Sequence, residues 1–96
     1  MKAIKKPVLV EVWQLPKMPE IDVRDIQNIF KELEQTLPTF VFNKVRCIFD
    51  PQEYRVNSLE GEMRAYPGDY IVQGSHDDVW VVQKDIFEDT YEVVER

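Results

Sequence analysis

Several kinds of residue are scarce in this 96-residue chain, and each scarcity excludes a class of protein. The single cysteine, Cys47, rules out an internal disulfide and a multi-cysteine zinc site. The single histidine, His76, rules out a catalytic site with two histidines, and three glycines include no glycine-rich phosphate loop. No apolar run approaches the roughly 20 residues of a membrane-spanning helix, and the first residues lack a classical secretion signal. We therefore expect a protein of the reducing cytoplasm that is not embedded in a membrane.

Basic residues are also in the minority, with 12 Lys and Arg against 18 Asp and Glu and a formal net charge of -6. Binding to a phosphate backbone needs clustered Lys and Arg, so nucleic acid is not expected as a direct ligand. Carboxylates are dense between Asp77 and Glu95, whereas Lys2, Lys5 and Lys6 form a small basic patch. The asymmetry suits a basic partner, and a merely solvated acidic face is the alternative explanation.

The length fits one domain with one hydrophobic core. We treat residues 1–96 as a single α+β domain, with a helix over about 22–37 and a β-rich part over about 39–94. A core of this size leaves a modest stability margin, which association into a homodimer could increase. The sequence permits such a dimer without indicating it.

Two segments near the start have clear periodicity. Residues 7–13 alternate valines with Leu9, Glu11 and Trp13, which predicts a first strand that ends by about Leu15. From residue 22 the apolar positions recur at three- and four-residue steps, which is typical of an amphipathic helix. Asp22 is the expected N-cap and Pro38 forces the exit. The apolar stripe of this helix consists of Ile26, Ile29, Phe30, Leu33 and Leu37.

The remainder predicts short strands separated by turns. Residues 39–49 are expected to form a strand with a bulge near Asn43, joined through an Asp50-Pro51 turn to a strand over 54–59. Glu60-Gly61 and a type II turn over 66–69 separate the next strands, because Gly68 supplies a positive φ. Further strands are expected over 62–66, 70–73, 79–82 and 90–94, with a short helical turn over 85–88. The strand over 79–82 is apolar on both faces, which suits a central or a doubly covered strand.

These elements define an α+β fold in which one amphipathic helix packs on a curved, mainly antiparallel β-sheet or a partly open small barrel. Parallel βαβ architecture lacks the helices it would need.

No catalytic motif is present. Cys47 lies among apolar residues and is expected to be a core thiol, and Ser58 and Ser75 lack the setting of a serine nucleophile. Pairs of carboxylates such as Glu60 and Glu62 are common on any acidic surface. We therefore expect no enzyme, no cofactor and no bound metal. A metal-dependent hydrolase that uses Asp69 and His76 is the weakest of three functional hypotheses.

Aromatic and acidic side chains are the better candidates for function. Aromatic rings combine a large contact area with a polar tip, and they are enriched where proteins bind. Tyr66 precedes the Pro67-Gly68 turn and should be exposed, and one of the two tryptophans should lie outside the main core. The candidate binding residues are Trp13, Tyr66, Asp69, Asp77, Asp78 and Trp80.

Four blocks carry a family resemblance: Lys-Pro-Val-Leu-Val-Glu-Val at 6–12, Leu-Glu-Gly-Glu-Met at 59–63, Pro-Gly-Asp-Tyr-Ile-Val-Gln-Gly at 67–74, and Lys-Asp-Ile-Phe-Glu-Asp-Thr-Tyr-Glu at 84–92. In this order the chain resembles small phage and prophage proteins named for a Pro-Gly-Asp-Tyr motif, most of which have no assigned function. The resemblance implies a viral origin and a host cytoplasm. The chain departs from the family where Asp-Val-Trp-Val-Val-Gln at 78–83 replaces a stretch with proline and cysteine. Among the matching residues, Asp69 is expected to bond turn amides.

The first functional hypothesis is therefore a small phage-encoded accessory protein that binds a host protein with a basic surface, without catalysis, and antagonises host defence or regulation. The second is a protein that binds or sequesters a small nucleotide-like ligand, with a dimer interface as one site for it. In that hypothesis aromatic rings stack on the base and the phosphate pairs with Lys5, Arg46, Arg55 or Arg64.

Overall fold

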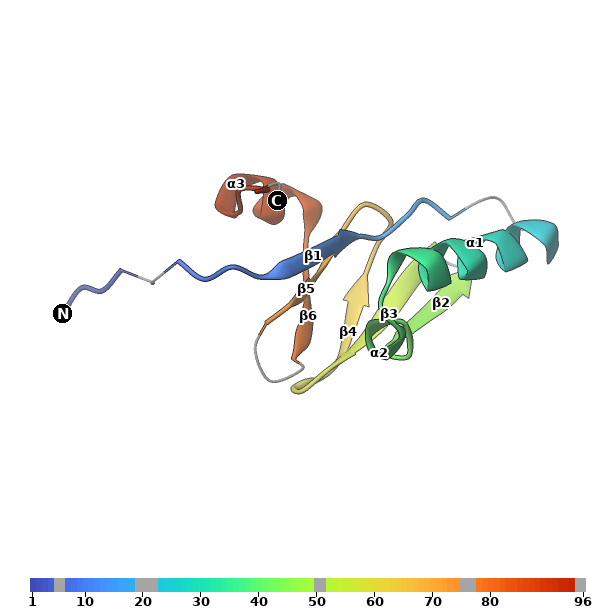
Figure 1. The fold of residues 1–96 in the computed structure, drawn as a ribbon, viewed down its shortest axis with the longest axis horizontal. Coiled ribbons are helices and arrows are strands. Elements are labelled where there is room, and N and C mark those ends of the chain that lie inside the picture. The colour runs from blue at the N-terminus through green and yellow to red at the C-terminus, as the bar shows by residue number, and fades with distance from the viewer. Residues whose placement is uncertain (5–6, 19–22, 50–51, 75–77, 95–96) are drawn as a thin grey trace.

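We analysed a computed structural model of the chain, which describes residues 1–4, 7–18, 23–49, 52–74 and 78–94. In chain order the elements are β1 (Glu11–Gln14), α1 (Val23–Thr36), α2 (Thr39–Phe42), β2 (Val45–Phe49), β3 (Gln52–Ser58), β4 (Gly61–Ala65), β5 (Tyr70–Gln73), β6 (Val79–Val82) and α3 (Lys84–Thr90). The strands form two three-stranded antiparallel sheets, ordered β1-β5-β6 and β2-β3-β4 (Figure 1). The predicted α+β class on antiparallel sheets is confirmed, and the described strands do not close into a barrel.

Two hairpins build the β2-β3-β4 sheet. The sequence predicted the first hairpin and the turn of the second. Val45 pairs with Val56 in the first, and Ser58 pairs with Gly61 in the second. Gly61 has a φ of 117°, a conformation that side chains disfavour, and the hydroxyl of Ser58 donates a 2.8 Å bond to its carbonyl. The second turn is therefore specified by local chemistry.

The β1-β5-β6 sheet joins the two ends of the chain. Gln14 pairs with Tyr70, and the carbonyl of Tyr66 accepts a 3.0 Å bond from the Asp69 amide across the preceding turn. Gly68 has a φ of 95° in this turn, as the type II prediction requires. The backbone of Leu15 exchanges two hydrogen bonds with the turn, at 2.8 Å and 2.9 Å. The segment after β1 is thereby fixed against the turn between β4 and β5.

The core lies between α1 and the two sheets. Ile29 and Leu33 of α1, with Leu37 directly after its end, form a buried stripe. Phe30 is more exposed and makes an edge contact with Phe49 of β2. The hydroxyl of the buried Tyr54 donates a 2.7 Å bond to the Pro16 carbonyl. The buried core cluster contains Leu15, Met18, Ile29, Leu33, Leu37, Val41, Tyr54, Val56, Ala65, Ile71 and Val79.

Some predicted strands are wrong at the ends of the chain. β1 begins at Glu11 and not at residue 7, because its partner β5 ends at Gln73, opposite Glu11. Residues 91–94 form no strand, and α3 extends over seven residues in place of the predicted short turn at 85–88. β6 is an edge strand of its sheet, so of the two predicted alternatives the central strand is wrong. The doubly covered strand fits, because β6 also packs against β3 and β4.

The segment over 39–49 differs most from its prediction. Residues 39–42 form the short helix α2, so the chain has three described helices where one was expected. The carbonyl of Pro38 accepts the amides of Val41 and Phe42 at 3.0 Å and 2.9 Å, which closes the helical turn. The change of phase near Asn43 is therefore a helix end and not a bulge.

Several predictions concern residues outside the described part of the chain: the Asp22 cap, the Asp50-Pro51 turn, and the side chains of His76 and Asp77. Within the described parts, none of the helices has the length and apolar character needed to cross a lipid bilayer.

Candidate functional site

A groove lies where the β3–β4 hairpin meets the start of β6. It has a volume of about 390 Å³ and is lined by Ser58, Glu60, Met63, Asp78 and Trp80. The hairpin supplies the first three residues, Asp78 directly precedes β6, and Trp80 lies within β6. The groove therefore depends on the packing of one sheet against the other.

Trp80 forms an aromatic wall of this groove. Its indole lies over Gly74, because a β-carbon added to Gly74 would be 2.8 Å from the Cη2 and Cζ3 atoms of the ring. The amide of Gly74 donates a 2.9 Å bond to the Asp78 carbonyl, which holds the two ends of the β5–β6 connection together. Trp80 is half-buried. The indole ring of Trp80 thus packs against Gly74 while part of the ring surface stays exposed to solvent.

The groove carries negative charge that no described cation neutralises. Glu60 is exposed, Asp78 is half-buried, and neither carboxylate forms an ion pair with a described residue. A cation is attracted both to carboxylates and to the face of an indole ring. The polarizable thioether of Met63 can adapt to the stem of a long side chain. The chemistry of the groove therefore suits a Lys ammonium or an Arg guanidinium.

Asp69, in contrast, has a structural role. Asp69 is buried, with 8% of the residue exposed. Its Oδ2 accepts a hydrogen bond from the Tyr66 amide at 2.9 Å, and Oδ1 accepts one from the Lys84 amide at 3.0 Å. The second bond satisfies a donor in the first turn of α3, where the N-cap residue Gln83 makes no side-chain bond. Both oxygens of Asp69 are thus engaged in holding the turn to the last helix.

A ring stack completes the attachment of α3. Phe87 lies between Tyr70 and Tyr91, with ring centroids 3.8 Å and 4.8 Å away and nearly parallel planes. Phe87 is buried, so the stack covers the end of β5 with α3. The matching residues of the Pro-Gly-Asp-Tyr and Asp-Ile-Phe blocks therefore pack against one another.

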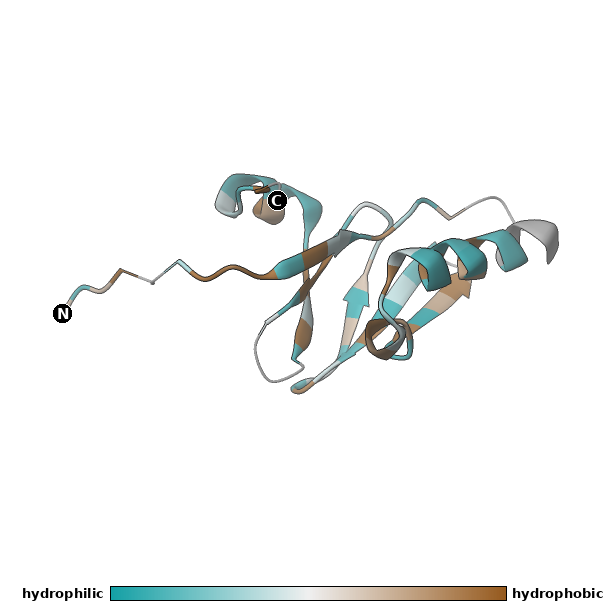
Figure 2. Cartoon of the chain, viewed as in Figure 1, coloured by the Kyte–Doolittle hydropathy of each residue, from teal (hydrophilic) through white to brown (hydrophobic). Residues whose placement is uncertain are grey.

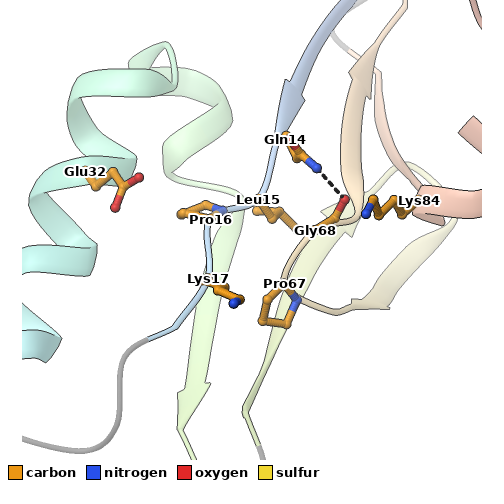
Figure 3. A pocket seen from close by; sticks show the side chains of 8 residues that line it. All are labelled: Gln14, Leu15, Pro16, Lys17, Glu32, Pro67, Gly68 and Lys84. Carbon is orange, nitrogen blue, oxygen red and sulfur yellow. Dashed lines mark hydrogen bonds between the residues drawn. The ribbon is translucent and has the colours of Figure 1, made fainter. Parts of the chain in front are cut away.

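A second hollow, of about 470 Å³, lies between the segment after β1 and the turn that precedes β5 (Figure 3). Lys17 and Lys84 line it together with Glu32, and the side-chain amide of Gln14 donates a 3.1 Å bond to the Gly68 carbonyl at its edge. It has no aromatic wall, and its charges are mixed. None of the predicted binding residues that the structure describes lines this hollow.

The arginines of the nucleotide hypothesis lie elsewhere. Arg46, Arg55 and Arg64 are neighbours in register across β2, β3 and β4. One oxygen of Glu53 accepts Nε of both Arg55 and Arg64 at 2.9 Å, and Glu62 bridges Arg46 and Arg55 at 2.8 Å and 3.2 Å. The hydrogen bond to Glu53 raises the pKa of the Arg55 guanidinium. These arginines neutralise carboxylates and line neither hollow, and Lys5 lies outside the described residues.

The structure thus brings together two of the predicted binding residues, Trp80 and Asp78. Tyr66 is exposed, as expected, and Trp13 packs against the core, which leaves Trp80 as the tryptophan outside it. Sequence reasoning missed Glu60 and Met63 as neighbours of Trp80. No local signal places them there, because the two sheets meet only in the folded chain.

Cys47 is half-buried against the core, and burial raises the pKa of its thiol from 9.0 to about 11. An increase of two units lowers the thiolate fraction near neutral pH roughly 100-fold. We therefore expect iodoacetamide to alkylate the folded protein at least about 100-fold more slowly than the urea-unfolded protein at the same pH. Equal rates in the two states would contradict the burial of this thiol.

Among the residues that the structure describes, no three His, Cys, Asp or Glu side chains gather closely enough to hold a metal ion. Comparisons with protein-family models, with curated proteins and with solved structures find no match to this chain. The resemblance to phage proteins therefore stays a prediction, and the proposal below depends on the geometry of the groove.

Proposed function

We propose that the protein is a non-catalytic binding protein that holds a basic segment of a partner protein in the groove of Trp80. The proposal depends on one observation: the half-buried indole of Trp80 lines the same groove as two carboxylates, Glu60 and Asp78, that no described cation neutralises. A Lys or Arg side chain of the partner lies along Met63 and places its charge between the carboxylates and the ring.

The expected strength of this contact is moderate. A cation over a tryptophan ring contributes about 0.5–2 kcal/mol, with the larger values in partly desolvated sites. Unpaired carboxylates add an attraction that weakens with salt, and the net charge of -6 steers basic partners toward the protein. One inserted side chain therefore acts as an anchor within a larger electrostatic contact.

The resemblance to phage proteins supplies the biological setting of the proposal. In that setting the partner is a host protein with a basic surface, such as one that itself contacts nucleic acid. Occupation of that surface by an acidic phage protein antagonises host defence or regulation. The second hypothesis, a nucleotide-like ligand, has less support because the arginines assigned to its phosphate are engaged in ion pairs.

The test compares variants of the groove for affinity toward a partner captured from host lysate. Trp80→Ala, and separately the charge-neutral pair Glu60→Gln with Asp78→Asn, should each raise the dissociation constant at least about tenfold, equivalent to 1.4 kcal/mol. Titration calorimetry at two salt concentrations measures the effect. The affinity of the parent protein should fall with added salt, and the neutral pair should lose most of that salt dependence.

Tyr66→Ala is the matched control, because Tyr66 is an exposed aromatic residue that lines neither hollow. Its affinity should stay within about twofold of the parent value, since most contacts outside an anchor are nearly neutral. If Tyr66→Ala lost binding while Trp80→Ala kept it, the binding site would lie at the turn before β5, and the proposal that the partner binds in the groove would be refuted.

A further inference from the structure

Residues 7–10 have a strand-forming sequence but no strand partner in the described part of the chain. β5 ends at Gln73, opposite Glu11, so the pairing of β1 stops where these residues begin. Leu9 is 84% exposed and Val8 is also exposed. Figures 1 and 2 show an extended hydrophobic segment that leads away from the body of the molecule into β1. Residues 7–10 are therefore an extended apolar segment that pairs with no described strand.

Residues 91–94 form a second segment of the same kind. The sequence predicts a strand here, and Tyr91 has extended dihedral angles, with φ at -117° and ψ at 146°. Val93 is 67% exposed and Val94 is similar, so their side chains pack against little of the molecule. Within one chain, Val8, Leu9, Val93 and Val94 are left exposed.

The two segments also carry opposite charges. Residues 1–10 contain three lysines and no acid, whereas residues 85–94 contain four carboxylates and neither Lys nor Arg. Unpaired strand edges are templates for another chain, and strand addition draws affinity from backbone bonds and specificity from side chains. Opposite charge next to each apolar stretch favours pairing of one segment with the other over pairing of either with itself.

We propose that residues 7–10 of one copy pair as a strand with residues 91–94 of a second copy, and the reverse, in a two-fold symmetric homodimer. A two-fold interface uses the same surfaces on both subunits, and the chain supplies both complementary segments. Each exchange covers Leu9 and its neighbouring valines with Val93 and Val94. The pairing uses no residue of the Trp80 groove, so it is independent of the proposed function.

Sedimentation velocity over a range of protein concentrations tests the dimer. The mass should move from that of one chain toward that of two, and Leu9→Glu should weaken the dimer at least about tenfold because it places a charge in the paired strand. Leu59→Glu is the matched control, since Leu59 is 71% exposed but lies in the β3–β4 turn. Circular dichroism checks that both variants remain folded. A single-chain mass at every concentration, or a dimer unaffected by Leu9→Glu, would overturn the proposal.

A disulfide experiment separates exchange between copies from pairing within one chain. A tagged copy with Leu9→Cys is mixed with an untagged copy with Val93→Cys and oxidised mildly. The expected product joins one tagged and one untagged copy, while the same mixture built on Leu59→Cys and Val93→Cys stays unlinked. If the variant with both Leu9→Cys and Val93→Cys closes only on itself, as a monomer, the partner is the same chain and the proposal is wrong.

Discussion

Replacing Asp69 by alanine is expected to lower the free energy of unfolding by about 2–4 kcal/mol, because two hydrogen bonds to a buried carboxylate are lost together. The amides of Tyr66 and Lys84 are left without their acceptors. The Lys84 amide lies in the first turn of α3, so the loss weakens that helix as well as the turn. Urea unfolding followed by circular dichroism measures the change.

Two comparisons make the Asp69 prediction specific. Asp69→Asn keeps one acceptor oxygen but directs its own side-chain N–H toward a backbone N–H. Its free energy of unfolding should therefore lie between those of the parent and the alanine variant. Asp78→Asn should change stability by no more than about 0.5 kcal/mol, because Asp78 forms no ion pair with a described residue. An unfolding midpoint of Asp69→Ala equal to that of the parent would show that the turn and α3 are held without this carboxylate.

Glu53→Gln is expected to be the second strongly destabilising change, with a loss of about 2–3 kcal/mol. Removal of one partner from a buried ion pair costs about 3–5 kcal/mol, and the cost is lower here because Arg64 is largely exposed. Glu53 is 5% exposed and separates guanidinium groups that are direct cross-strand neighbours. Without its charge, Arg55 and Arg64 repel each other across β3 and β4.

Glu62→Gln is the control for this prediction, because Glu62 also bridges two arginines but is far more exposed. Its cost should stay below about 1 kcal/mol, as for other surface ion pairs. Added salt should narrow the stability difference between Glu53→Gln and the parent only slightly, since the buried carboxylate is poorly screened. Equal stability of the two glutamine variants would mean that burial of Glu53 has no energetic role.

The sequence predicted well where local chemistry decides the structure. Gly61 and Gly68 both adopt positive φ in turns that the sequence located, and β5 and β6 coincide with the expected segments over 70–73 and 79–82. Of the predicted stripe, Ile29, Leu33 and Leu37 are buried, whereas Phe30 is exposed and the side chain of Ile26 lies outside the described part. Turn residues and short-range periodicity act within a few positions, so one sequence contains enough information to read them.

Features that depend on distant contacts could not be read in this way. α2 is a single helical turn closed on the Pro38 carbonyl, too short for a periodic signal to separate it from a strand. The bond from Lys84 to Asp69 spans 15 positions, and the groove joins Glu60 to Trp80 only because two sheets pack together. The limit of β1 at Glu11 is set by the length of β5, not by its own residues.

The most direct test of the binding proposal follows the indole N–H resonance of Trp80 by NMR while a short arginine- and lysine-rich peptide is added. The Trp13→Phe variant identifies which of the two tryptophan signals belongs to Trp80. The account predicts a saturable shift of the Trp80 signal that salt weakens and that the Glu60→Gln, Asp78→Asn pair removes, with the Trp13 signal of the parent protein unmoved. A Trp80 signal that stays in place while the peptide perturbs Trp13 or the residues near Tyr66 would contradict it.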